Sequence, residues 1–311
     1  MELNQKINFY EKRDFGEKIN VTFAFLRQNF APLAKSILYI AGPAILLIAV
    51  VTGIYQAALL NLGGETDSLE GPIGLVRETS PMDILSVYSQ GTLTSFLSIF
   101  ASALLVTVVY AYLVLYVERE DYDNITVAEV WERVKQHYLV VVVSTFVYSV
   151  LVVLGFMLLI IPGFIAIAAL SFLFIIQIKE GLSLGAAFSR CFKLVSDNYL
   201  STLGLIFVTS ILIAIISMVV MLPFGLALGV PTFFSLTQGN GLEDSEGTLQ
   251  IFLIIFQALS SLLSYLLYAI LLIAVAFQYA NLVEKKEAAG LLESVNTIGQ
   301  TTQPTREDET Y

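Results

Sequence analysis

The chain has 311 residues, of which 57% are apolar and 14% are charged, and its formal net charge at pH 7 is −10. This composition excludes an ordinary soluble domain, because such a domain must keep polar side chains over most of its outer surface. The 16 Lys and Arg residues are scattered rather than gathered with aromatic residues, so a nucleic-acid surface is not expected. The composition predicts an all-α membrane protein.

Five long tracts contain no Asp, Glu, Lys, Arg or His, and they cover residues 36–64, 84–117, 138–178, 198–242 and 247–283. Each tract exceeds the roughly 20 residues that a helix needs to cross a bilayer. Pro162-Gly163 predicts a tight turn inside the third tract, which makes that tract a helical hairpin. Residues 232–242 of the fourth tract are polar and predict an irregular segment after one long span.

The sequence therefore predicts six transmembrane helices, at residues 37–59, 91–116, 139–161, 164–178, 200–222 and 251–282. With these spans, 15 of the 16 Lys and Arg residues lie on one side of the membrane and only Arg77 lies on the other. Lys and Arg near span ends are retained in the cytoplasm. We therefore expect a multi-pass protein of the cell membrane with both termini in the cytoplasm.

The spans divide the chain into three parts. Residues 1–14 form a cytoplasmic N-terminal segment, residues 15–283 form the six-span membrane domain, and residues 284–311 form a cytoplasmic tail. The tail is rich in Thr, Gln and charged residues, which is typical of disordered segments.

Three cytoplasmic segments repeat one plan, in which an amphipathic helix is followed by Asn or His, an aromatic residue and a membrane span. The apolar stripes of these helices are Phe15, Ile19, Phe23, Leu26 and Phe30; Val127, Val130, Trp131 and Val134; and Leu184, Phe188, Cys191, Phe192 and Val195. Thr126 and Glu129 also predict a capping box at the start of the second helix. This internal repeat predicts three units, each made of one interfacial helix and two spans.

Helices of this kind lie at the membrane surface, with their aromatic face in the acyl boundary and their cations near phosphates. The simpler interpretation is that they only orient the next span. The candidate lipid-headgroup or interface residues are Arg27, Asn29, Phe30, Arg133, His137, Tyr138, Arg190, Lys193, Asn198 and Tyr199.

The last span carries a polar stripe on one face, formed at intervals of four, three and four residues by Gln257, Ser261, Ser264 and Tyr268. Hydrogen bonding between packed helices explains such a stripe without a ligand. Alternatively, the stripe lines a polar cavity or a groove for lipid headgroups, with Gln278 and Asn281 near its cytoplasmic mouth.

Residues for catalysis are scarce in this sequence. None of the six predicted spans contains an ionisable Asp, Glu, Lys, Arg or His, which argues against a proton- or sodium-coupled transporter. His137 is the only histidine, so the chain offers too few histidine side chains for a His-based metal site and only one for a Ser-His pair. We expect no enzyme activity, no cofactor and no metal.

One stretch resembles a pattern that recurs in bacterial membrane proteins, in which an apolar-Pro-Gly turn and a short span are followed by Ala-x-x-Arg/Ser and Lys. It consists of Ile160-Ile161-Pro162-Gly163-Phe164, Ser171-Phe172, Ile178-Lys179-Glu180-Gly181, Ala186-Ala187-Phe188-Ser189-Arg190-Cys191-Phe192-Lys193 and Asn198-Tyr199. The pattern resembles the six-helix family that includes the membrane domain of membrane-anchored glycerophosphodiester phosphodiesterases and uncharacterised relatives.

The resemblance covers about residues 19–283 and implies a bacterial inner-membrane location. In the phosphodiesterases, hydrolysis belongs to a separate soluble barrel domain, and nothing of that size follows Val283. The resemblance therefore implies a stand-alone membrane domain without the enzymatic activity.

Two functions remain open from the sequence. The first is a non-catalytic module that organises lipids or partner proteins, and the second is a channel or transporter for a neutral or lipid-like solute. The expected partners are membrane lipids, together with a protein partner or a second copy of the chain as a homo-oligomer.

Overall fold

The computed structural model describes residues 5–64, 81–120, 124–237 and 246–288. These residues form helices only: α1 (Phe15–Ser36), the π-helical turn η1 (Ile37–Ala41), α2 (Gly42–Gly64), α3 (Pro81–Glu118), α4 (Val127–Leu158), α5 (Ile160–Leu170), α6 (Leu173–Glu180), α7 (Leu184–Val195), α8 (Tyr199–Thr237) and α9 (Glu246–Glu287). Six helical segments of the described chain are long and apolar enough to cross a membrane. The prediction of an all-α protein with six such helices is confirmed.

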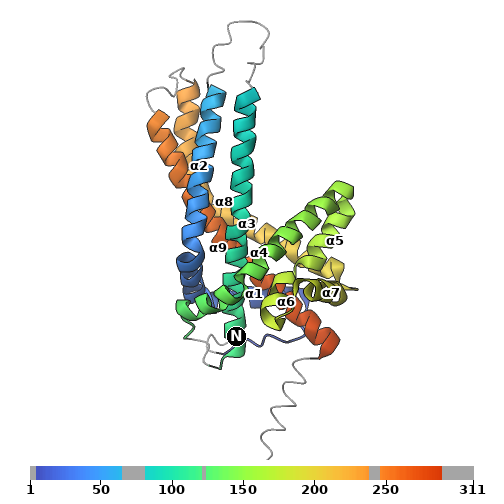
Figure 1. The fold of residues 1–311 in the computed structure, drawn as a ribbon. Helices are drawn as coiled ribbons and strands as arrows, with labels where there is room; N and C mark the ends of the chain where they lie inside the picture. Colours follow the sequence, from blue (N-terminus) through green and yellow to red (C-terminus); the bar gives the residue numbers. More distant parts are fainter. Residues whose placement is uncertain (1–4, 65–80, 121–123, 238–245, 289–311) are drawn as a thin grey trace, which may run out of the picture.

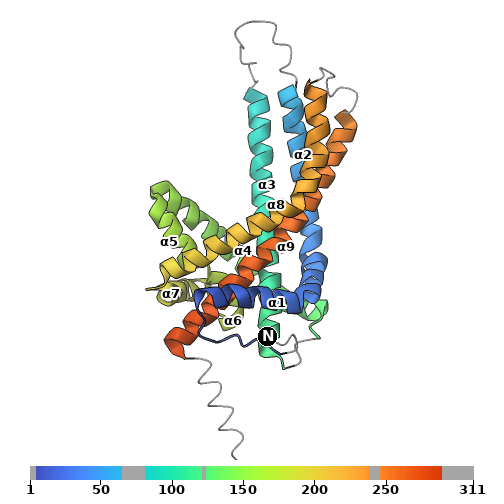
Figure 2. The same cartoon turned by 180° about the vertical axis from the view of Figure 1, so that it is seen from behind.

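Helices α2 and α3 stand upright beside the upper parts of α8 and α9, while the α4–α5 hairpin leans away from them (Figure 1). Helix α1 lies across the lower end of this bundle at a steep angle to α2 (Figure 2). Helices α6 and α7 lie at the same lower end. The fold therefore collects its short and crossing helices at one end.

The sequence predicts the turn of the α4–α5 hairpin at Pro162-Gly163, but in the structure the turn lies earlier. The chain breaks at Leu159, whose backbone is extended (φ −163°, ψ 156°), and Pro162 lies in the first turn of α5. Proline is tolerated there because the first N–H groups of a helix have no intrahelical partner. The two helices meet so closely at Gly155 that a Cβ there would lie 3.0 Å from the Cα of Gly163.

Helix α8 also differs from the predicted span at residues 200–222, because it continues through Pro223 to Thr237. A proline inside a helix removes one backbone hydrogen bond and bends the helix without having to end it. Helix α8 changes direction along its length, from a tilted first part to an upright second part (Figure 2). Part of the predicted irregular segment at 232–242 is therefore helical, and residues 238–245 lie outside the described residues.

The three predicted interfacial helices join their spans in three different ways. Helix α1 continues through the π-helical turn η1 into α2, and α4 runs from its surface part into its span as one helix. Helix α7 is separated from α8 by a short break at Asp197, whose φ of 66° is left-handed. The capping box predicted from Thr126 and Glu129 is confirmed, and Asp14 and Glu17 form a second one at the start of α1.

The core is densest at the lower end, where large aromatic side chains from α1, α3, α9 and the turn before α6 are fully buried. They are Phe25, Tyr110, Tyr112, Tyr116, Phe172, Phe277 and Tyr279. The segment before α1 packs on the same core, because Phe9 is buried and Lys6 Nζ donates to the carbonyls of Val117 (2.9 Å) and Arg119 (2.7 Å). By contrast, only 11% of the most apolar stretch of α8 is buried, as expected of a helix that faces lipid.

Candidate functional site

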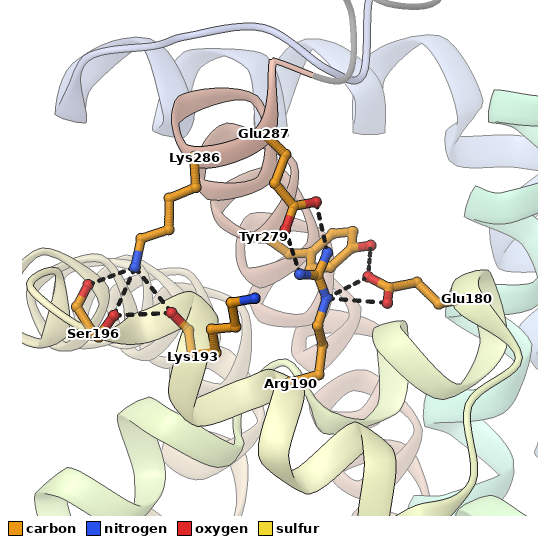
Figure 3. Close-up of polar contacts among 7 residues, drawn as sticks. All are labelled: Glu180, Arg190, Lys193, Ser196, Tyr279, Lys286 and Glu287. Atoms are coloured by element: carbon orange, nitrogen blue, oxygen red, sulfur yellow. Dashed lines mark hydrogen bonds and ion pairs between the residues drawn. The ribbon is translucent and has the colours of Figure 1, made fainter.

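Four side chains from α6, α7 and α9 form a polar cluster at the lower end of the bundle (Figure 3). Arg190 Nε donates to Glu180 Oε2 at 3.1 Å, and Arg190 Nη2 donates to Glu287 Oε2 at 2.9 Å. The hydroxyl of Tyr279 donates to Glu180 Oε1 at 2.6 Å. We call Glu180, Arg190, Tyr279 and Glu287 the α7 cluster.

Lys286 contacts the C-terminal end of α7 (Figure 3). Its ammonium donates to the carbonyls of Lys193 and Ser196, both at 2.9 Å, and to Ser196 Oγ at 2.7 Å. The last carbonyls of a helix lack intrahelical partners and carry partial negative charge, so a lysine there is stabilising. The end of α9 is thus attached to α7 by Glu287 and Lys286, and α7 cannot move without breaking these contacts.

The α7 cluster and its surroundings shift two ionisation equilibria. Hydrogen bonding to Glu287 is the main cause that raises the pKa of Arg190 above its ordinary value, and the Glu180 carboxylate adds to this effect. Burial raises the pKa of the Cys191 thiol to about 12. Cys191 is fully buried and stays protonated at neutral pH, so it lacks the exposed thiolate that a catalytic nucleophile needs.

A second ionic cluster has a similar arrangement at the junction between α3 and α4. Glu118, the last residue of α3, pairs with Arg133 of α4 and accepts a bond from Lys179 at 3.3 Å. Glu180 at the end of α6 pairs in the same way with Arg190 of the following helix. At both junctions, therefore, a carboxylate that ends one helix is paired with an arginine of the next surface helix.

Neutral hydrogen bonds fix α1 against α3. The buried hydroxyl of Tyr112 donates to Asn29 Oδ1 at 3.0 Å, and the hydroxyl of Tyr116 donates to Gln28 Oε1 at 3.0 Å. Tyr116 also accepts the backbone N–H of Ile7 at 2.9 Å. One face of α1 is thus committed to the bundle, while Phe30 on another face is 61% exposed.

The structure separates the predicted headgroup residues into two groups. Arg27, Phe30 and the side chain of Lys193 are exposed at the lower end, and Arg27 forms no ion pair with the described carboxylates. The others are at least half-buried and contact protein groups: Asn29, Arg133, His137, Tyr138, Arg190, Asn198 and Tyr199. A role in lipid contact stays a prediction for both groups.

The predicted polar stripe on α9 satisfies most of its hydrogen bonds within its own helix. Gln257 Nε2 donates to Ser261 Oγ at 3.1 Å, and Ser264 Oγ donates to the carbonyl of Ser260 at 2.7 Å. Ser264 and Tyr268 are exposed on the described surface. Gln257, Ser261 and Ser264 are therefore hydrogen-bonded within α9, and a cavity lined by the stripe stays a prediction.

Sequence reasoning did not predict that Lys18 of α1 is a buried cation. It is 4% exposed and donates to Gln278 Oε1 of α9 at 2.8 Å. A signal was available, because Lys18 shares its helix face with Val21, Thr22 and Phe25, which are also buried.

No protein-family model, curated protein or solved structure matches this chain. Function must therefore be inferred from the geometry of the molecule itself. Among the described residues, no group of three or more His, Cys, Asp and Glu side chains is placed to hold a metal ion.

Proposed function

We propose that the protein is a non-catalytic membrane module that organises lipids or partner proteins at the lower end of its bundle. The observation that supports this function is the collection of α1, the start of α4 and α7 at that end, where ion pairs fix the two later helices. Such an assembly presents a broad surface at headgroup depth. The resemblance to the membrane domain of a six-helix family fits the same proposal.

In this proposal the chain consists of three units, each with one interfacial helix and two spans. The units are α1 with α2 and α3, the start of α4 with the rest of α4 and α5–α6, and α7 with α8 and α9. The pairs Glu118–Arg133 and Glu180–Arg190 favour this division, because each joins the end of one unit to the first helix of the next.

Exposed side chains at the lower end have the character of a membrane interface. Trp131 of α4 is 43% exposed, and Phe30, Arg27 and Lys193 are exposed on α1 and α7. Aromatic rings prefer the headgroup boundary, and cations there attract anionic lipids by about 1 kcal/mol each. The distribution of Lys and Arg further favours the cytoplasmic leaflet, with both termini on that side.

The test compares two doubly substituted variants that lose the same charge. Arg27→Gln/Lys193→Gln removes the exposed surface cations, and Arg77→Gln/Arg306→Gln removes two cations from the predicted loop and tail. Native mass spectrometry of protein extracted from its own membrane counts the bound anionic lipids and co-purifying proteins. We expect the first variant alone to lose lipids or partners. Unchanged lipids and partners in both variants would contradict the proposed function.

The alternative function, a channel or transporter for a neutral or lipid-like solute, has a separate readout. Flux of a solute panel into proteoliposomes would support it, provided that Gln257→Leu or Ser261→Leu in the polar stripe reduces the flux. Under the proposed function, neither the wild-type protein nor these variants should produce flux above empty liposomes.

A further inference from the structure

Lys18 belongs to a hydrogen-bonded network that links α1, α8 and α9. Its Nζ donates to Gln278 Oε1 at 2.8 Å and lies 3.5 Å from Ser201 Oγ. Gln278 Nε2 in turn donates to Thr202 Oγ1 at 3.0 Å. The buried ammonium is therefore held at the first turn of α8.

The network continues from this buried lysine to an exposed one. Thr202 donates its backbone N–H and its hydroxyl to the carbonyl of Asn198, both at 3.0 Å. Asn198 Oδ1 accepts a bond from Lys285 Nζ at 3.3 Å. We call the six residues of this network the α8 lysine site: Lys18, Asn198, Ser201, Thr202, Gln278 and Lys285.

The α8 lysine site has positive charge without a paired anion. None of its hydrogen bonds among the described residues involves a carboxylate, whereas Arg133 pairs with one carboxylate and Arg190 with two. A buried cation without an ion pair is costly, and the start of α8 adds the positive end of a helix dipole. The site therefore attracts an anion.

Two acidic residues lie near the site but do not neutralise it by contact. The carboxylate of Asp14 influences Lys18 electrostatically, but it caps α1 by accepting the N–H of Glu17 at 2.7 Å. Asp197 precedes Asn198, is exposed, and forms no ion pair with the described residues. Among the described residues, neither Lys18 nor Lys285 forms an ion pair, and both donate only to neutral oxygens.

Exposed apolar side chains close to the α8 lysine site, in space for Phe15 and in sequence for Leu200, indicate what kind of anion it suits. The ring centre of Phe15 lies 5.8 Å from Lys18 Nζ, and Phe15 is 39% exposed. Leu200, in the first turn of α8, is 85% exposed. A ligand here would place its charge near the lysines and an apolar chain against Phe15 and Leu200, as a phospholipid does.

We propose that the α8 lysine site binds the phosphate group of an anionic phospholipid. Lys285 contacts the phosphate from the exposed side, the start of α8 offers backbone N–H groups, and Lys18 supplies the buried charge. This inference rests on the proposed function and names the lipid class and the place where the lipid binds.

The experiment measures thermal unfolding of the full chain in neutral detergent, titrated with phosphatidylglycerol, with phosphatidylcholine or with inorganic phosphate. Lys285→Gln and Lys18→Met test the site, and Lys135→Gln is a control that removes one exposed lysine from α4. For the wild type and the control we expect phosphatidylglycerol alone to raise the melting temperature.

The two site variants should differ from the control in a characteristic way. Lys285→Gln should weaken phosphatidylglycerol binding about fivefold, since one lysine at a headgroup contributes about 1 kcal/mol. Lys18→Met should weaken binding at least tenfold without lowering the melting temperature in lipid-free detergent, because it replaces an unpaired buried charge with an apolar chain. A purely structural lysine would give the opposite, a lower melting temperature with unchanged lipid binding.

Several outcomes would overturn this inference. Equal stabilisation by phosphatidylcholine would show that no anion is recognised, and stabilisation by inorganic phosphate alone would assign the site to a soluble anion. Unchanged phosphatidylglycerol binding in Lys285→Gln would show that the lipid binds at another site, even if Lys18→Met failed to fold. The proposed function would survive that result if the Arg27→Gln/Lys193→Gln variant still lost its lipids.

Discussion

Arg190 and Glu287 are 97 residues apart in the sequence, yet two guanidinium nitrogens of Arg190 donate to the two carboxylate oxygens of Glu287. This two-fold contact has the fork geometry in which arginine binds carboxylates most strongly. Because α9 also packs on α1, α2 and α8, the pair connects α7 to the rest of the lower end. This ion pair therefore links α7, the third surface helix, to α9, the last span.

The first prediction concerns this pair. Arg190→Gln should lower the free energy of unfolding by about 2 kcal/mol, because it removes the partly buried partner of Glu180 and Glu287. The control Lys135→Gln breaks an exposed pair with Glu132 and should change the free energy of unfolding by less than about 0.5 kcal/mol. Chemical denaturation in detergent measures the free energy of unfolding of both variants. Equal losses would show that the α7 cluster stabilises the protein no more than an exposed ion pair does.

The second prediction uses the only cysteine of the chain. Since burial raises the pKa of Cys191 to about 12, the thiolate is scarce at pH 8 and the side chain is enclosed, so alkylation by a maleimide should be slow. Labelling should accelerate only as the pH rises toward 12 or the protein unfolds. Mass spectrometry of the labelled fraction measures this, and rapid labelling of the folded protein at pH 8 would show that Cys191 is accessible.

The same thiol reports on the α7 cluster. Cys191 follows Arg190 on α7, so Arg190→Gln should speed labelling at pH 8 if α7 detaches from α9. A variant that unfolds more easily but labels at the wild-type rate under native conditions would show that α7 stays in place without the ion pair.

The third prediction concerns the α4–α5 hairpin. Gly155→Ala should destabilise the protein by about 1 to 2 kcal/mol, because its Cβ would lie 3.0 Å from the Cα of Gly163, and backbone atoms would have to move. In the matched control Gly185→Ala, the new Cβ meets nothing within 4 Å, and alanine favours the helix. Thermal unfolding should therefore rank Gly185→Ala at or above the wild type and Gly155→Ala below it.

The fourth prediction distinguishes a packing role of Asn29 from the headgroup role that the sequence predicted. Tyr112→Phe should lower the free energy of unfolding by about 1 kcal/mol, because Asn29 Oδ1 would lose a buried hydrogen bond. In a double-mutant cycle with Asn29→Leu, the two losses should not add. Additive losses would mean that Asn29 and Tyr112 act independently, which would favour the headgroup role.

Local signals in the sequence predicted local features well. Thr126 and Glu129 stand three residues apart and form the predicted capping box, because both partners belong to one turn of helix. The hairpin turn was placed at Pro162 rather than Leu159, because a proline is a breaker inside a helix but is tolerated in its first turn. The end of α8 was missed for a related reason, since Pro223 bends that helix instead of ending it.

Side-chain partners were harder to predict than helices. Arg133 and Arg190 were assigned to the lipid surface, and the structure pairs them with Glu118 and Glu180. Lys18 appeared to be one of six cations before the first span, and the structure buries it against Gln278. Charge predicts the side of the membrane and periodicity predicts the buried face of a helix, but neither predicts the neighbouring helix.

The sequence by itself determined that this chain forms six long apolar helices, because a bilayer without water in its core leaves a lipid-facing span no means of satisfying its backbone except a helix. That requirement is met within each segment, so composition and length are enough to reveal it. Only the tertiary structure decided which cations find carboxylates and which, like Lys18, do not. Those contacts join residues from different helices, and their distances depend on how every helix packs at the lower end.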